Sequence, residues 1–121
     1  MAYLLMAMLA MEDKEEGEMK KLFVSCPMNG KTFEEVVEVR KEAIKLMKEK
    51  FPNEEFEVLK TFLDFEEGTH PLKYMAESIR MLADADIAFF ANDWHKARGC
   101  KIERECAATY GIQMIDEYPE V

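Results

Sequence analysis

The sequence predicts a single domain with an open parallel α/β sheet of the flavodoxin or Rossmann-like kind. Short apolar and β-branched runs alternate along the chain with longer segments whose apolar residues recur at helical spacing. Such alternation is typical of parallel strands joined by crossover helices. The chain has 121 residues, of which 49% are hydrophobic, so it can form one domain with its own core.

The first strand and the first helix have clear signals. Leu22–Cys26 is a short apolar run that ends at a proline, which predicts a buried strand. Thr32–Lys50 has helical spacing, and Thr32 with Glu35 matches a capping box. Arg40 interrupts the apolar stripe of this helix, so its side chain either reaches past the stripe to solvent or contacts a ligand. The stripe consists of Phe33, Val36, Val37, Ile44, Met47 and Phe51.

A second strand and a second helix are expected next. Glu55–Lys60 alternates between apolar and charged residues, which predicts a strand. Thr61–His70 is expected to be a loop, and Pro71 suits the first position of a helix. The apolar stripe of this helix consists of Leu72, Met75, Ala76, Ile79, Leu82 and Ala83.

The last part of the domain repeats the pattern. Asp86–Ala91 is expected to be a fully buried strand, and Asn92–Arg98 the loop that follows it. A helix is expected over Gly99–Tyr110, with Gly111 as the glycine after its C-terminal cap. Ile112–Ile115 then predicts a short final strand.

Connection rules turn these elements into a topology. Right-handed crossovers favour the strand order 2-1-3-4, with a switch point between the first and third strands. Ligands of open α/β sheets bind at such a point, beyond the carboxyl ends of the strands. The residues there are Ser25–Gly30 and Asn92–Gly99. We therefore expect the binding site to be formed by these two loops.

Composition narrows the functional classes. The formal net charge is −9 without an evident basic patch, which argues against nucleic acid and anionic membranes as partners. The chain contains no apolar run of about 18 residues, so no membrane span is expected. We interpret residues 1–18 as an apolar and acidic extension, and residues 19–121 as the domain.

The cysteines are interpreted as reduced thiols of a cytoplasmic protein. Cys26, Cys100 and Cys106 form no Cys-x-x-Cys pair, and their number is odd. A zinc site of His95 with Cys100 and Cys106 has the wrong spacing, because the two cysteines lie on different sides of one helix. Neither a metal nor a cofactor is therefore expected.

Glu103 is an unusual residue in the predicted last helix. It falls within a stripe of small and apolar residues, whereas Lys101, Arg104 and Glu105 fall outside it, as surface charges should. A buried carboxylate needs a partner or a cavity. Two interpretations stay open: a functional carboxylate, or a charge favoured by the nearby helix N-terminus. The stripe consists of Gly99, Ile102, Glu103, Cys106, Ala107 and Tyr110.

The two loops offer further candidates. Ser25 supplies a hydroxyl, and backbone N–H groups through Met28, Asn29 and Gly30 could hold a sugar or phosphate; an ordinary turn is the alternative. Asp93 lies at the start of the loop after the third strand, where a side chain points into the crevice. Its neighbour Trp94 could stack on a base or merely cover the sheet edge, whereas Asp86 is expected to have a structural role.

Three segments together resemble the nucleoside 2-deoxyribosyltransferase-like superfamily, in particular its DUF4406-type branch. They read FVSCPMNG, MAESIRMLADADIAFFANDW and ARGCKIERECAATYGI, and the resemblance covers residues 20–117. Gly99, Glu103 and Ala107 keep the spacing of the family's Ser-x-Gly-x-x-x-Glu-x-x-x-Ala pattern. The resemblance implies cleavage or transfer of an N-glycosidic bond.

The resemblance also implies roles for individual residues. Glu103 would attack the sugar C1′, as the nucleophile of a retaining glycosidase does. Asp93 would protonate the leaving base or recognise it, Ser25 would bind the sugar or phosphate, and Glu77 would orient the nucleophile or the base. Many transferases carry an acidic residue just before a Ser/Thr-Gly pair, and here Ala97-Arg98-Gly99 replaces that pattern. Arg98 would suit a phosphate better than a nucleobase. Nucleosides and nucleotides are therefore both expected ligands. A second departure from the family pattern is Cys26, which stands where the family usually has glycine.

Three functional hypotheses follow. The first is a deoxyribosyltransferase or N-glycoside hydrolase, and the second is a non-catalytic nucleotide-binding or signal-sequestering protein. The third, a purely structural protein, is disfavoured by the polar residues at the strand ends. We also expect a homodimer or higher homo-oligomer, because the apolar residues of positions 1–11 would otherwise face water. Asp116–Val121, with Tyr118, could reach a neighbouring subunit.

Overall fold

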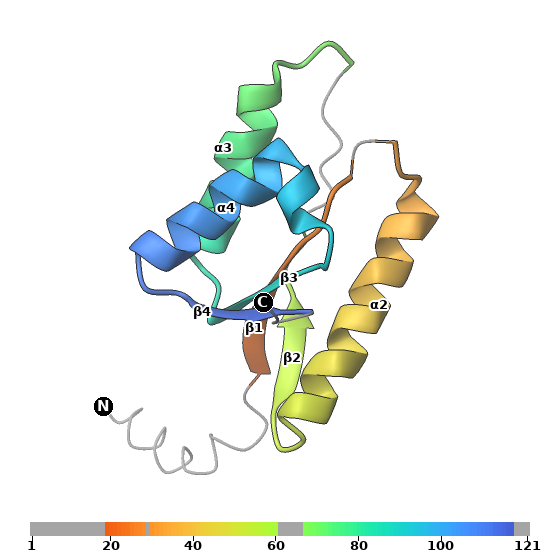
Figure 1. Cartoon of the computed structure of the whole chain (residues 1–121), viewed down its shortest axis with the longest axis vertical. Coiled ribbons are helices and arrows are strands. Elements are labelled where there is room, and N and C mark those ends of the chain that lie inside the picture. The colour runs from red at the N-terminus through yellow and green to blue at the C-terminus, as the bar shows by residue number, and fades with distance from the viewer. Residues whose placement is uncertain (1–18, 29, 61–66, 118–121) are drawn as a thin grey trace, which may run out of the picture.

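The computed structural model describes residues 19–28, 30–60 and 67–117. Its strands all pair in parallel, in the order β2-β1-β3-β4. The predicted fold class and strand order are therefore confirmed (Figure 1). Along the chain the elements are β1 (Met19–Ser25), α2 (Phe33–Lys50), β2 (Glu55–Val58), α3 (Pro71–Leu82), β3 (Ile87–Phe90), the 3-10 turn η1 (Trp94–Lys96), α4 (Arg98–Thr109) and β4 (Gln113–Asp116).

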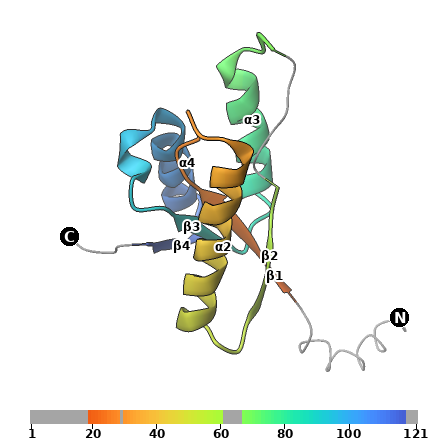
Figure 2. The ribbon, with the colours of Figure 1, turned by 90° about the vertical axis from the view of Figure 1, so that its right-hand side faces the viewer.

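The sheet has a helix layer on each face. Helix α2 covers one face, and α3 and α4 cover the other (Figures 1 and 2). Residues of β1 alternate between the two layers: Leu22 and Val24 pack with Met47 of α2, whereas Phe23 packs with Leu82 and Ala107. This alternation follows from the two-residue period of a strand, and it decides which side chains can share a site.

Helix α2 begins as its sequence predicts. Thr32 is the N-cap: its side chain accepts a hydrogen bond from the Glu35 backbone, and the Glu35 carboxylate accepts one from the Thr32 backbone. The buried face differs from the predicted stripe, because Ala43 is buried and Phe33 is 53% exposed. Phe33 occupies the first turn, before the turns that carry the buried residues.

Helix α3 is less buried than its stripe predicted. Pro71 occupies the first turn as expected, and the preceding His70 caps the helix by accepting a hydrogen bond from the Leu72 backbone. Leu72 is nevertheless 68% exposed, and Ala76 and Ala83 are exposed as well. The start of α3 extends beyond the sheet (Figures 1 and 2), so the apolar residues there lie away from the sheet against which the rest of the helix packs.

The buried face of α4 is also corrected. It carries Cys100, Glu103 and Ala107, whereas Ile102 is 41% and Tyr110 is 81% exposed. The apolar stripe was therefore placed too far towards Ile102 and Tyr110. Helix α4 ends with Gly111 at φ +79°, the left-handed conformation that glycine adopts most easily, which confirms its predicted position after the cap.

The strand boundaries differ from prediction by a few residues. Strand β1 begins at Met19, because its first residues pair with β2. The backbone N–H of Lys21 donates to the Asp86 carboxylate at 2.7 Å, which gives Asp86 the expected structural role. Positions 1–18, 29, 61–66 and 118–121 lie outside the described residues, and so do the predictions made for them. None of the helices described is long and apolar enough to span a membrane.

Candidate functional site

The carboxylate of Glu103 is buried at the carboxyl end of β1. Its side chain projects from α4, and the residue is 9% exposed. Ser25, the last residue of β1, donates a hydrogen bond of 2.6 Å from its Oγ to Oε1 of Glu103. The alternation of β1 points Ser25 towards α4, since it follows the same face as Phe23. Both residues were candidates from the sequence, and the fold brings them into contact.

The environment of Glu103 changes its acidity. Burial raises the pKa of Glu103, because the charged form loses solvation. Hydrogen bonds from the Ser25 and Ser78 hydroxyls lower this pKa and so oppose part of the effect. The carboxyl therefore keeps its proton to a higher pH than an ordinary glutamate does. Raised carboxyl pKa values of this kind are common at functional sites, although buried structural groups show them too.

Two cysteines lie in the same electrostatic environment. Burial raises the pKa of Cys26 to about 11 and that of Cys100 to about 12. The charges of Asp93 and Glu103 raise both pKa values further, whereas Lys31 and Arg40 lower that of Cys26. Both thiols are therefore protonated at neutral pH, and a protonated thiol is a weak nucleophile.

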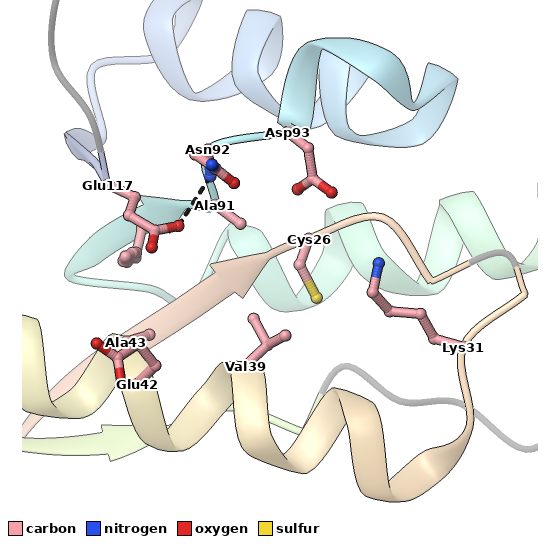
Figure 3. A pocket seen from close by; sticks show the side chains of 10 residues that line it. Cys26, Lys31, Val39, Glu42, Ala43, Ala91, Asn92, Asp93 and Glu117 are labelled. Atoms are coloured by element: carbon pink, nitrogen blue, oxygen red, sulfur yellow. Dashed lines mark hydrogen bonds between the residues drawn. The ribbon is translucent and has the colours of Figure 1, made fainter.

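A cleft of about 200 Å³ opens on the α2 side of the sheet. Figure 3 shows the Asp93 carboxylate and the Lys31 amine both directed towards the thiol of Cys26. Glu42 and Glu117 lie at the other end of the cleft. The cleft thus combines an apolar floor with one cationic and several acidic groups. Its lining consists of Cys26, Lys31, Val39, Glu42, Ala43, Phe89, Ala91, Asn92, Asp93 and Glu117.

The predicted site is divided between the two faces of the sheet. Asp93 lines the cleft, but it does not directly follow β3, because that strand ends at Phe90 and Asp93 begins the turn η1. Ser25 and Glu103 do not line it, since Ser25 points towards α4 and the adjacent Cys26 points towards α2. The two groups are nevertheless close enough that Asp93 and Glu103 both act on the pKa of Cys26.

Trp94 and Glu77 have partners within the chain. The guanidinium of Arg104 lies 4.6 Å from the centre of the Trp94 ring, which favours the interpretation that this ring covers the sheet edge. The carboxylate of Glu77 forms a salt bridge with the guanidinium of Arg80, one turn further along α3. The next residue, Ser78, supplies the hydroxyl that hydrogen-bonds to Glu103.

The first loop is a turn. The backbone N–H of Lys31 donates to the Met28 carbonyl at 3.0 Å, and Gly30 is exposed with φ +83°. Met28 is half-buried, and position 29 is not described. At the start of α4, Arg98 is exposed and Gly99 is half-buried, and neither lines the cleft.

Comparison with protein families identifies the family of this domain. The family model described as Domain of unknown function (DUF4406) matches residues 20–116. The chain belongs to the DUF4406 family. The match spans the chain from the second residue of β1 to the last residue of β4. A comparison with curated proteins finds no match.

Several residues of the cleft in this DUF4406 domain were not singled out from the sequence. Glu117 follows β4, and its Oε1 accepts a hydrogen bond of 2.9 Å from the Asn92 backbone. Asn92 belongs to the loop that was expected to form the site, and the rule that sites form at the carboxyl ends of strands could also have found Glu117. Lys31 and Glu42 resemble ordinary surface charges in the sequence. Among the residues the structure describes, no cluster of His, Cys, Asp and Glu side chains is arranged to hold a metal ion.

Proposed function

We propose that this DUF4406 domain cleaves or transfers the N-glycosidic bond of a nucleoside or nucleotide, with Glu103 as the nucleophile. The observation that carries the proposal is the burial of the Glu103 carboxyl group against the Ser25 hydroxyl at the carboxyl end of β1. Burying a carboxyl group beside neutral hydroxyls costs stability, so a functional use accounts for it. The resemblance of the segments around Ser25, Asp93 and Glu103 to the nucleoside 2-deoxyribosyltransferase-like superfamily supports the same chemistry.

The proposed reaction has two steps. The Glu103 carboxylate attacks C1′ of the sugar while the C1′–N bond breaks, and the electron pair of that bond leaves with the base. Asp93 donates a proton to the departing base or binds it. The resulting glycosyl ester is then opened at C1′, either by water, which gives hydrolysis, or by a second base, which gives transfer. The second step frees the Glu103 carboxylate, and the proton lost by the attacking water or base returns to Asp93, as the acid does in a retaining glycosidase.

Protonation of Glu103 limits this mechanism. Only the carboxylate is nucleophilic, and burial raises the pKa of Glu103. Ser25 and Ser78 oppose this shift by donating hydrogen bonds to Glu103. In this proposal they position the nucleophile and keep part of it ionised. The rate is therefore expected to increase with pH through the ionisation of Glu103.

Charge in the cleft favours a ligand without a phosphate. Three carboxylates, those of Glu42, Asp93 and Glu117, line it together with the amine of Lys31. A phosphate dianion would add repulsion there, whereas sugar hydroxyls and base amino groups can donate to carboxylates. Arg98 would favour the opposite choice, since its guanidinium suits phosphate.

The test is incubation with a panel of nucleosides and their 5′-monophosphates, followed by chromatography for free base. Preferred release from nucleosides would support a role for the cleft carboxylates. Monophosphates that bind more than about tenfold tighter, with the difference lost in Arg98→Ala, would instead assign the phosphate to Arg98.

A covalent intermediate is the direct test of the nucleophile. A 2′-fluoro arabinosyl nucleoside should leave a sugar adduct on Glu103, which mass spectrometry of peptides would locate. Glu103→Gln should lose several orders of magnitude in turnover, whereas Glu105→Gln, an exposed glutamate of the same helix, should keep it. Full turnover by Glu103→Gln would remove Glu103 as the nucleophile.

The second candidate is a non-catalytic nucleotide-binding protein. The observation that favours it is the separation of Glu103 from the cleft lining, together with its raised pKa. A protonated carboxyl below the cleft would serve as a structural hydrogen-bonding group. Saturable binding of a nucleotide, with no free base released and no adduct formed, would favour this function over catalysis.

A further inference from the structure

Arg104 links several parts of the fold around the candidate site. It follows Glu103 on α4, and its guanidinium lies 4.6 Å from the centre of the Trp94 ring and 5.4 Å from that of Phe90. One nitrogen, Nη2, donates to Oδ2 of Asp116 at 3.0 Å. The side chains of Arg104 and Asp116 are only 26% and 23% exposed. Arg104 is therefore half-buried and held by contacts, whereas the sequence indicated an ordinary surface charge.

The contacts of this arginine end next to the cleft. Trp94 directly follows Asp93, and Asp116 directly precedes Glu117. Asp93 and Glu117 both line the cleft, and Glu117 accepts a hydrogen bond from the Asn92 backbone. Arg104 is the neighbour of Glu103 in the sequence. Its guanidinium therefore connects α4 to the turn after β3, through Trp94, and to the end of β4, through Asp116.

We propose that Arg104 is a positioning residue that fixes the turn of residues 92–97, and with it Asp93, relative to Glu103. The proposal rests on the proposed function, in which Asp93 acts on the leaving base. A planar guanidinium can stack on an aromatic ring while it donates to a carboxylate, whereas a lysine amine cannot do both in this geometry. Arg104→Lys should therefore keep the charge and lose the alignment.

The first test follows the turn itself and needs no substrate. Trp94 is the single tryptophan of the chain, so its fluorescence reports directly on the Arg104 contact. Arg104→Lys and Arg104→Met should increase acrylamide quenching of Trp94. They should also increase hydrogen exchange of the Trp94, Lys96 and Ala97 amides, which bond within this turn, by about fivefold or more.

The matched control is Arg80→Lys. Arg80 is also a helical arginine paired with an acidic residue, but its side chain is 69% exposed and it does not line the cleft. Its replacement should leave quenching and exchange unchanged. Thermal unfolding of every variant shows whether it folds; if Arg104→Met does not, Arg104→Lys and Asp116→Asn decide the result.

The second test measures the consequence for the site. With the nucleoside that the wild type cleaves best, Arg104→Lys should lower kcat/KM about tenfold or more, since small displacements of an aligned group are costly. The control variant Arg80→Lys should leave kcat/KM unchanged. Unchanged exchange in the turn would overturn the proposal, and so would faster exchange with full kcat/KM, because Arg104 would then be structural only.

The proposed function can fail separately. If the wild type releases no base from any nucleoside or monophosphate, the N-glycosidic activity is wrong, and the positioning role is decided by nucleoside binding. Loss of affinity in Arg104→Lys together with faster exchange would support it. Unchanged affinity, or a wild type that binds none of these compounds, would overturn it.

Discussion

The Ser25 hydroxyl donates a hydrogen bond of 2.6 Å to the carboxylate of Glu103, joining the end of β1 to α4 across 78 positions of sequence. The contact depends on strand alternation, which turns Ser25 towards α4 while Cys26 turns towards α2. Asp93 lies in the turn that follows the neighbouring strand β3. This end of the sheet therefore brings two carboxyl groups into one electrostatic environment, since both act on the pKa of Cys26.

Removing the Ser25 hydroxyl should change both acidity and stability. Burial raises the pKa of Glu103 and the Ser25 hydrogen bond lowers it, so Ser25→Ala should raise this pKa further. The acidic limb of the rate profile should then move to higher pH. Leaving a buried acceptor with fewer partners should also cost about 1–3 kcal/mol of unfolding free energy. Rates measured from pH 5 to 9 and urea unfolding test the two effects.

Thr109→Ala is the control for this variant. Thr109 also donates its hydroxyl to a glutamate of α4, Glu105, but this pair is exposed. Its loss should alter neither the rate profile nor the stability by more than a few tenths of a kcal/mol. An unchanged profile in Ser25→Ala would show that its hydroxyl does not set the ionisation of Glu103.

Replacing Glu103 by Gln should stabilise the protein at neutral and alkaline pH. The raised pKa means that the folded state binds the proton more tightly than the unfolded state. The stability this confers is fully present below the ordinary glutamate pKa, and it is lost as pH rises through the raised value. Glutamine is neutral throughout and can still accept from Ser25. The difference between variant and wild type should grow by about 1.4 kcal/mol per pH unit between the two pKa values.

Urea unfolding at pH 5, 6.5 and 8 measures this difference. Glu105→Gln, on the exposed face of α4, should show no comparable growth. If the unfolding free energies of Glu103→Gln and wild type stayed parallel over this range, burial of the charged carboxylate would not be destabilising the fold.

The fold was more predictable than the site. Alternating strand and helix patterns indicated the sheet, and the Thr32–Glu35 capping box correctly placed the start of α2. Glu103 was recognised because a carboxylate within an apolar stripe is conspicuous, even though the stripe itself was misplaced. Arg104 was missed because a charged residue outside the apolar stripe of a helix is normally a surface residue. Its burial depends on the ring of Trp94 and on Asp116, which meet it only after the sheet has assembled.

Cys26 should report occupation of the cleft. Its pKa of about 11, raised by burial, leaves roughly one thiol in several thousand ionised at pH 7.5. Alkylation by iodoacetamide should therefore be slow, and a nucleoside bound in the cleft should slow it further. Cys106, which is half-buried and does not line the cleft, is the internal control in the same peptide analysis. Equal protection of both thiols would mean that the ligand does not bind in the cleft.

The chain is expected to form at least a homodimer. Seven methionine and leucine side chains lie among the first 11 residues, and a segment this short does not fold alone in water. They are Met1, Leu4, Leu5, Met6, Met8, Leu9 and Met11. The described part of the domain adds Ile102 and Tyr110, which are 41% and 81% exposed on α4. The C-terminal segment was expected to contact a neighbouring subunit. Its first two residues, Asp116 and Glu117, instead accept hydrogen bonds from Arg104 and Asn92 of their own chain.

Light scattering can separate these contributions. The full chain should be an oligomer, and a chain that begins at Met19, the first residue of β1, should dissociate if the leading segment forms the contact. Tyr110→Glu in the full chain should dissociate it instead if α4 forms the contact, because a charge would then enter an apolar interface. Circular dichroism should show an intact fold in both variants. A full chain that scatters as a monomer over the micromolar range would contradict the prediction, whatever the variants do.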